Sequence, residues 1–278
     1  FAEQNFLFNN VTLSVGGLLN YNTSITNKFD FYPAINSSCR INEKLSLYAS
    51  WNKATRMPTF TDLYYTTKTH IGNSNLEAEK SEALETGLKL SNHIVKANLT
   101  AFYMKGRNLI DWVKPSEEAL WESRNHTEID KIGVETNFQF NLRELLGQSL
   151  PFQSLNLGYL YLDQNMVDDE LISNYTLNHL RHKFTANLQH DILRNLSLSW
   201  NFRWQERTGS YLKYEDLKPT EITRYKPFSL LDLKINYKLR NTNLYANINN
   251  LFNTEYFDLG NLPQPGIWMM AGVNYTIR

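Results

Sequence analysis

The chain has 278 residues, with 28 basic and 28 acidic side chains and no formal net charge. This balance argues against a nucleic-acid-binding protein, which would carry a basic surplus, and the 42% hydrophobic content argues against a charged disordered chain. The single cysteine, Cys39, excludes an internal disulfide and a four-thiolate zinc site.

Alternating apolar and polar residues dominate the sequence from its first residues onward. Successive side chains of a strand point to opposite faces, so each such series has one apolar face. The pattern predicts about 12 strands, over residues 5–22, 29–40, 44–56, 79–91, 94–113, 119–141, 153–166, 179–190, 193–207, 220–238, 241–251 and 266–277. A single helical turn is the alternative at 77–84 and at 142–146.

The lengths of these strands and of their connections indicate a membrane barrel. Many exceed the about 9 to 11 residues with which a tilted strand crosses a bilayer. Short connections (42–43, 91–93, 191–192 and 240–242) alternate with long ones (57–78, 167–178, 208–219 and 252–265), and only 142–152 departs from this rule. Short turns on one rim and long loops on the other are typical of outer-membrane barrels.

The alternation alone does not distinguish a membrane barrel from a soluble β-sandwich. Polar residues such as Lys96, Arg203, Asp232 and Lys234 fit either a barrel lumen or a solvated sheet. The 16 Tyr, 15 Phe and 6 Trp, many near predicted strand ends, favour the aromatic girdles of a barrel. We therefore predict an all-β fold, an antiparallel transmembrane β-barrel.

The sequence contains no pattern that indicates catalysis. The six histidines are scattered, no Gly-rich phosphate loop is present, and nothing places a nucleophile beside a base. We expect no enzymatic activity, no catalytic residue, no metal site and no cofactor.

Three groups of segments resemble one known family. The first runs from Ala49 to Tyr64, then from Gly72 to Ser81, with Glu-Thr-Gly at 85–87, and carries Arg56, Pro58, Asn73, Leu76, Glu79 and Glu85. The second, at 248–256 and 263–266, carries Asn250, Leu251, Phe252, Pro265 and Gly266, and the third is Gly133-Val134-Glu135. Together they resemble the signatures of TonB-dependent outer-membrane receptors. The segments 63–66, 71–73 and 108–113, with Trp121-x-x-Arg124-Asn125, most resemble cobalamin-type receptors of Bacteroidota.

This resemblance implies a 22-stranded barrel with an N-terminal plug and a segment that contacts TonB. Residues 1–278 would be its C-terminal part, about the last 12 strands, without the plug; alone they would form an open curved sheet. The chain begins at Phe1 without a start methionine or signal peptide, so we expect a fragment or a processed piece. Two departures are Ile267, where the family usually has arginine, and the ending Tyr275-Thr276-Ile277-Arg278, where an aromatic residue is usual. Either the true end lies beyond Arg278 or the assembly signal is weak.

The resemblance also implies the partners and the place of work. We expect a multi-pass protein of the bacterial outer membrane that contacts the lipid bilayer, its own plug, TonB, a small-molecule nutrient and a surface lipoprotein, but no nucleic acid. Cobalamin is the first candidate nutrient, followed by haem and then by a ferric siderophore or oligosaccharide. Two alternatives of other classes are a plug-less porin or adhesin barrel and a soluble β-sandwich that binds carbohydrate.

Ligand contacts are expected on the long loops. The candidates are Tyr64, Tyr65, His70, Trp121 and Tyr211. Aromatic rings at a mouth can stack on a planar ligand, and neutral imidazole is a good iron ligand. In haem receptors of the family, the ligating histidine lies between the two motif segments that here hold Arg56 and Asn75. The alternatives are that the tyrosines pack under the loop or in the girdle, that His70 is solvated, and that Trp112 belongs to the girdle.

Overall fold

A computed structural model describes residues 1–22, 29–116, 118–166, 171–173, 179–215, 218–260 and 262–277. The chain divides into two compact units. Unit 1 comprises Phe1–Lys89, Thr100–Val134 and Leu162–Leu177, and unit 2 comprises Leu90–Leu99, Glu135–Tyr161 and Asn178–Arg278.

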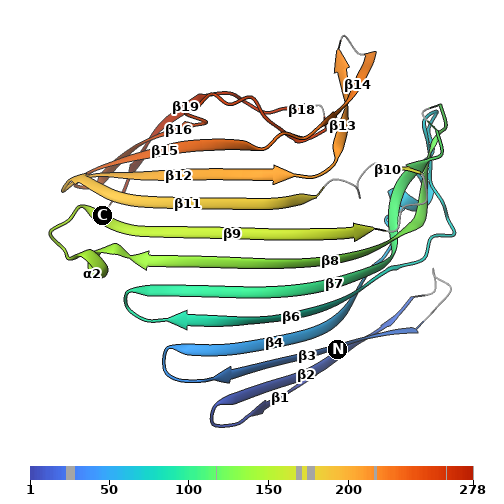
Figure 1. Ribbon diagram of the computed structural model, residues 1–278, viewed down its shortest axis with the longest axis horizontal. Helices are drawn as coiled ribbons and strands as arrows, with labels where there is room; N and C mark the ends of the chain where they lie inside the picture. The colour runs from blue at the N-terminus through green and yellow to red at the C-terminus, as the bar shows by residue number, and fades with distance from the viewer. Residues whose placement is uncertain are drawn as a thin grey trace. The chain divides into compact units, whose positions relative to one another are not determined.

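Strands make up most of both units, as the alternating pattern predicts (Figure 1). Up to residue 141 the elements are β1 (Ala2–Leu7), β2 (Val11–Tyr21), β3 (Phe29–Arg40), β4 (Leu45–Arg56), α1 (Phe60–Tyr64), β5 (His70–Ile71), β6 (Glu79–Ser91), β7 (Val95–Lys114) and β8 (Trp121–Asn141). They are followed by α2 (Leu142–Leu146), β9 (Phe152–Met166), β10 (Ile172–Ser173), β11 (Leu180–Leu193), β12 (Leu196–Arg207), β13 (Ser210–Glu215), β14 (Lys218–Arg224), β15 (Phe228–Leu239), β16 (Thr242–Asn249), β17 (Phe257–Leu259), β18 (Leu262–Pro263) and β19 (Trp268–Tyr275).

The main sheet joins the strands almost in chain order. Its order is β1-β2-β3-β4-β6-β7-β8-β9-β11-β12-β15-β16-β19, with short β5 and β10 pairing at the side with β8 and β7. The pairs β1·β2, β2·β3, β3·β4, β9·β11, β11·β12, β12·β15, β15·β16 and β16·β19 are antiparallel. The predicted antiparallel all-β architecture is thus confirmed.

Several predicted boundaries are wrong, and turn chemistry explains them. The predicted strand 5–22 is the hairpin β1–β2, closed by a hydrogen bond from Phe8 N to Val11 O (2.8 Å). The predicted strand 220–238 is split into β14 and β15 around Pro227, which has no N–H to donate to a ladder. The predicted loop 208–219 contains β13 and the start of β14, and the turn predicted at 191–192 lies three residues later, at 194–195.

The two helical alternatives had different outcomes. Residues 142–146 form α2, whereas 79–84 belong to β6, and α1 was not predicted at all. None of the helices in the described part of the chain is long and apolar enough to cross a membrane.

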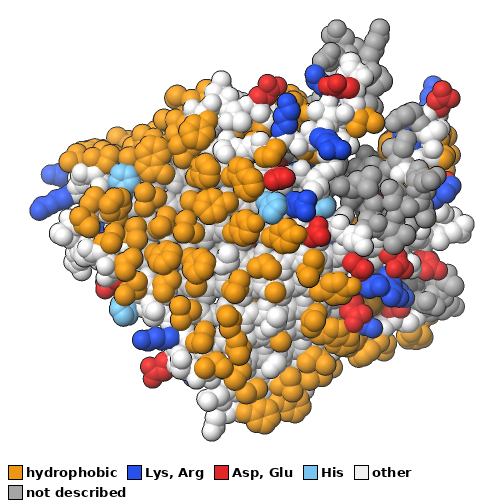
Figure 2. All heavy atoms as spheres, viewed as in Figure 1, with side chains coloured by type: hydrophobic (Ala, Val, Ile, Leu, Met, Phe, Trp, Pro, Cys, Tyr) orange, Lys and Arg blue, Asp and Glu red, His pale blue; other side chains and the backbone are white. Residues whose placement is uncertain are grey.

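One face of the sheet in each unit is apolar, with side chains that are half-buried or exposed. In unit 2 a single cross-strand row consists of Leu155, Leu188, Trp200, Leu233, Ile248 and Met269. In unit 1, Val15, Ile35 and Trp51 form a corresponding row. Figure 2 shows hydrophobic side chains spread over one face, with charged groups sparse in its middle. An exposed face of this kind fits contact with lipid.

The opposite face of unit 2 is polar. Asn156 Nδ2 donates to Asn187 Oδ1 (3.3 Å), and Asn187 Nδ2 donates to Asn201 Oδ1 (2.5 Å), so amides bridge three neighbouring strands. On this face the backbone at Gly158 lies so close to a neighbouring side chain that there is no room for a Cβ atom. A Cβ on Gly158 would lie 2.7 Å from Thr185 Oγ1.

Buried residues concentrate near strand ends rather than along strand centres. In unit 1, Ile110, Trp112 and Val113 are buried at the end of β7, where Asp111 is fully buried as well. In unit 2, Tyr225, Phe228 and Leu230 are buried around the start of β15. The loop-bearing ends therefore hold most of the packed core, and they position the candidate sites.

Candidate functional site

The loop that follows β4 begins with a helix whose direction is fixed by its own side chains. Thr59 is the N-cap of α1: its Oγ1 accepts from Asp62 N (3.1 Å), and Asp62 Oδ2 accepts from Thr59 N (2.9 Å). This reciprocal capping box satisfies N–H groups that the first turn leaves unpaired. Pro58, directly before the cap, fits the extended backbone there. The Pro-Thr-x-x-Asp segment thus ends the extended chain that follows β4 and starts α1.

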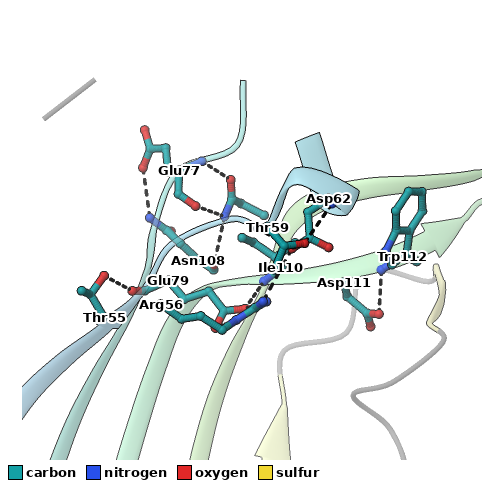
Figure 3. A network of polar contacts seen from close by, with 11 residues as sticks. Thr55, Arg56, Thr59, Asp62, Glu77, Glu79, Asn108, Ile110, Asp111 and Trp112 are labelled. Carbon is teal, nitrogen blue, oxygen red and sulfur yellow. Dashed lines mark hydrogen bonds and ion pairs between the residues drawn. The ribbon is translucent and has the colours of Figure 1, made fainter. Parts of the chain in front are cut away.

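An arginine at the end of β4 ties the loop to the next strand. Arg56 Nε donates to Glu79 Oε2 (2.7 Å), and Arg56 Nη2 donates to Glu79 Oε1 (2.5 Å), a bidentate pair (Figure 3). Arg56 Nη1 also lies 3.6 Å from Asp62 Oδ2. Glu79 Oε1 further accepts from Ile110 N (2.8 Å). One carboxylate therefore connects β4, β6 and β7.

A second set of contacts holds the end of the loop. Asn125 Oδ1 accepts from Glu77 N (2.7 Å), while Asn125 Nδ2 donates to Asn108 O (2.7 Å). Asn108 Nδ2 donates to Glu77 Oε2 (3.0 Å), and Asn108 has a φ of 54°, a conformation that asparagine tolerates. Asn73 N donates to Asp62 O (2.9 Å), and Leu76 is 5% exposed. We call the contacts of Arg56, Thr59, Asp62, Glu77, Glu79, Asn108 and Asn125 the loop-base network.

The loop-base network supports an aromatic cluster formed by Tyr65, His70, Trp112 and Trp121. The His70 ring centre lies 5.2 Å from that of Trp112, 6.0 Å from that of Tyr65 and 6.5 Å from that of Trp121. Short β5 pairs in parallel with β8, which sets His70 opposite Trp121. Gly72 must be glycine, because a Cβ there would lie 2.9 Å from the backbone of Leu63 and Tyr64.

The structure brings together three of the five candidate ligand residues. Tyr65, His70 and Trp121 share the aromatic cluster, whereas Tyr64 is 63% exposed and contacts Phe60 instead. Trp112, interpreted from the sequence as a girdle residue, is 6% exposed and contacts Tyr65 and His70 within the cluster. The assignment of Trp112 to the girdle left it out of the candidate site, although residues 108–113 belong to a segment that resembles cobalamin-type receptors.

The electrostatics of the cluster are set by one histidine, one lysine and one buried acid. His70 Nδ1 is hydrogen-bonded to Thr69 Oγ1 (2.9 Å), and Lys114 Nζ lies 4.9 Å from the ring centre of Trp121. Asp111 Oδ1 accepts from Trp112 N (2.7 Å). The cluster thus offers a partly exposed aromatic surface beside a fixed imidazole.

The fifth candidate, Tyr211, lies in unit 2 in a second aromatic group. Its ring centre is 5.0 Å from that of Tyr225 and 5.5 Å from that of Phe257. Burial raises the pKa of the Tyr211 hydroxyl above its usual value. Tyr225 was not predicted as a site residue: it lies in the predicted strand 220–238, whereas β13, which presents Tyr211 to it, lies in the predicted loop 208–219.

A cavity of about 570 Å³ opens beside this second group. Its lining includes three cations, Lys213, Arg224 and Lys226, and two carboxylates, Glu221 and Glu255. Aromatic walls with a few charged groups are typical of small-molecule sites.

The C-terminal motif also proves to be a loop base. Asn250 Oδ1 accepts from Thr254 N (2.9 Å), and Asn250 Nδ2 donates to Thr254 O (2.8 Å) and Pro265 O (3.3 Å). Asn250 N donates to Asp232 Oδ1 (2.8 Å). Asn253 Oδ1 accepts from Ile267 N (2.9 Å) and lies where a Cβ on Gly266 would be, 2.6 Å away. We call this set the asparagine turn.

Of the remaining motif residues, Leu251 and Phe252 lie in the turn after β16, and Glu85, Gly133 and Glu135 lie on strands. Leu251 N donates to Leu231 O (2.7 Å), which anchors the asparagine turn to β15, while Phe252 is 56% exposed and lines the cavity. Glu85 is half-buried on β6, Gly133 is buried on β8, and Glu135 is exposed and accepts from Asn137 Nδ2 (3.0 Å). Within the described ranges, no three His, Cys, Asp or Glu side chains are grouped to hold a metal ion.

Comparison with known proteins identifies the architecture. The sequence model of the family described as TonB dependent receptor-like, beta-barrel, matches residues 1–251. The vitamin B12 transporter BtuB of Vibrio vulnificus is 29% identical over 98 residues, which are 34% of this chain and 16% of that protein.

Solved structures match nearly the whole chain. The FrpB iron transporter of Neisseria meningitidis (F3-3 variant) superposes with a TM-score of 0.71 and 19% identity, over 98% of this chain and 44% of that one. The siderophore receptor PirA of Pseudomonas aeruginosa gives 0.72 and 17%, over 99% and 45%. At these identities the likeness shows the fold, and the chain spans less than half the length of either structure.

Proposed function

Because the chain belongs to the TonB-dependent receptor-like β-barrel family, we propose that it is the C-terminal barrel part of an active nutrient transporter. Membership places it in the outer membrane of Gram-negative bacteria. In this proposal the plug and the segment that contacts TonB belong to the rest of the protein. The soluble β-sandwich does not fit a member of this family.

The proposed mechanism involves binding and gating without covalent chemistry. The apolar face of each unit contacts lipid, and the polar face, with its bridged asparagines, lines the lumen. The long loops capture the nutrient, and the plug, pulled through TonB, opens the path. The role of this chain is to hold rigid loop bases around a surface that recognises the nutrient.

We propose cobalamin as the nutrient, and the aromatic cluster carries this proposal. Tyr65, His70 and Trp121 present rings at the base of the loop, with the buried Trp112 ring packed behind them, and flat apolar rings suit a large planar macrocycle. The likeness over 98 residues to a protein named as a vitamin B12 transporter is consistent with it.

Haem or a ferric siderophore is the second candidate, favoured by two observations. His70 Nδ1 is hydrogen-bonded to Thr69 Oγ1, so Nε2 is the ring nitrogen that would ligate an iron. The cavity beside Tyr211 combines aromatic walls with three cations, which suits an anionic aromatic chelator.

The test is a titration of the detergent-purified receptor with cobalamin and with haem. The variants are His70→Ala and, as a matched control, His93→Ala, which removes an exposed histidine at a short turn. Cobalamin binding that survives both substitutions supports the proposal. Haem binding that is lost only in His70→Ala would replace cobalamin with haem and make His70 the axial ligand.

A plug-less porin is distinguished by conductance. A plugged receptor in a planar bilayer should pass almost no current, whereas an open porin conducts steadily. Steady conductance by the intact receptor would contradict the transporter proposal.

A further inference from the structure

A group of basic side chains lies on the apolar face of unit 1, away from the aromatic cluster. Lys53 on β4 shares its face with Leu47 and Trp51, because alternate residues of a strand point the same way. On β6, Lys80 lies on the face of exposed Leu84 and Leu88, and on β7, Lys105 and Arg107 lie on the face of Leu99 and Tyr103. We call Lys53, Lys80, Lys105 and Arg107 the basic group.

The basic group lies at one end of the apolar face. Along β4 the order is Leu45, Leu47, Ala49, Trp51 and then Lys53. Along β7 it is Leu99, Ala101, Tyr103 and then Lys105 and Arg107, and β6 starts with Lys80 before its leucines. This sequence of aliphatic, aromatic and basic residues follows the change from hydrocarbon through interface to headgroup. The basic group is therefore at headgroup depth on the long-loop side.

The aromatic residues at the boundary are fixed by carboxylates. Trp51 Nε1 donates to Glu82 Oε1 (2.7 Å), and Tyr103 Oη donates to Asp130 Oδ1 (3.1 Å). Lys80 Nζ lies 3.5 Å from Asp30 Oδ1. Glu82, Asp130 and Asp30 thus each have a hydrogen-bond or ion-pair partner, and of these three acids only Asp30 is paired with a cation of the group.

Among the described residues, the other three cations have no acidic ion-pair partner. Within the described part of unit 1, no carboxylate forms an ion pair with Lys53, Lys105 or Arg107. Lys53 Nζ lies 5.7 Å from the ring centre of Trp51, which holds it beside the interface. All four cations line one cavity of about 300 Å³, together with Asp30 and Glu82.

We propose that this cavity binds the phosphate-bearing headgroup of a lipid in the outer leaflet. Lysine and arginine bind phosphate through charge-assisted hydrogen bonds, and phosphate is the anion that membranes present at this depth. The adjacent exposed leucines would contact the acyl chains of the same lipid. The source is thus a lipid rather than free phosphate, because the site continues into the apolar face.

The experiment compares lipid binding by the receptor in phosphatidylcholine nanodiscs with and without lipid A, a phosphorylated glycolipid. The test variant combines Lys53→Gln, Lys105→Gln and Arg107→Gln. The control combines Lys44→Gln, Lys96→Gln and Lys238→Gln, exposed cations next to short turns, and removes the same charge. Co-purified lipid is counted by native mass spectrometry, and affinity is taken from titration with the lipid.

The expected result is an affinity about 100-fold lower in the test variant, with the control unchanged. Nutrient binding should be unaffected in both, because the basic group is not part of the aromatic cluster. Equal lipid binding by parent and test variant would overturn the proposal, as would an equal loss in the control. Displacement of the lipid by inorganic phosphate at matched concentration would instead show a free-phosphate site and overturn the lipid assignment.

Discussion

The loop-base network and the asparagine turn have similar structural roles but differ in chemistry. The loop-base network of unit 1 contains an ion pair between Arg56 and Glu79, and the Arg56 side chain is 48% exposed. The asparagine turn of unit 2 depends on neutral amides, and Asn250 is 3% exposed. Both connect the two ends of a loop: Arg56 at the end of β4 contacts Glu79 at the start of β6, and Asn250, directly after β16, contacts Pro265.

This difference determines how much free energy of unfolding each loop base loses when one of its residues is substituted. An exposed ion pair is screened by solvent and salt, so its removal costs little free energy. A buried amide that loses its partners leaves donors and acceptors unpaired away from water, which costs considerably more. The less charged base should therefore be the more sensitive to substitution.

The largest effect is expected for Asn250→Ala. It removes contacts with Thr254 and Pro265 and places alanine at a φ of 52°. We expect the free energy of unfolding to fall by about 3 kcal/mol, measured by thermal unfolding in detergent. Asn243→Ala, on half-buried β16, is the control. Equal losses in the two variants would show that the turn contributes nothing special.

A smaller effect is expected for Gly266→Ala. The added Cβ would lie 2.6 Å from Asn253 Oδ1, so the turn must shift, at about 2 kcal/mol. The same substitution in an Asn253→Ala background should cost much less, because the obstructing atom is gone. An unchanged cost in that background would mean that the crowding arises elsewhere.

The smallest of the three structural effects is expected for Glu79→Gln. The bidentate contact with Arg56 is lost while the shape remains, and because Arg56 is half exposed we expect about 1 kcal/mol. Glu85→Gln, on the same face of β6, is the matched control and should be neutral. Raising NaCl should shrink the Glu79→Gln cost and leave the Asn250→Ala cost unchanged. A salt-independent Glu79 effect would contradict the ionic description.

Most of the strand architecture is readable from the sequence, because a period of two marks each long strand. The β1–β2 hairpin was predicted as one strand, because Phe8, Asn9 and Asn10 interrupt the alternation for only three residues. The β13–β14 hairpin was not predicted, because its two strands pair only with each other, outside the main sheet, and neither is long enough to cross a membrane.

The candidate site was predictable in part. Tyr65, His70 and Trp121 follow from aromatic residues on long loops, but their contact depends on the parallel pairing of two-residue β5 with β8. Nothing local in the sequence encodes so short a pairing. The burial of Trp112 likewise depends on β7 continuing to Lys114 and on contacts from distant segments.

The central claim is that the loop-base network holds the aromatic cluster in a form that binds cobalamin. The most direct test is the affinity for cobalamin of the parent receptor, Glu79→Ala and Glu85→Ala, measured at one salt concentration. Glu79 contacts no ring of the cluster, yet its loss should weaken binding about tenfold, while Glu85→Ala binds like the parent. A folded Glu79→Ala variant that binds as tightly as the parent, or a parent that does not bind cobalamin, would contradict the account.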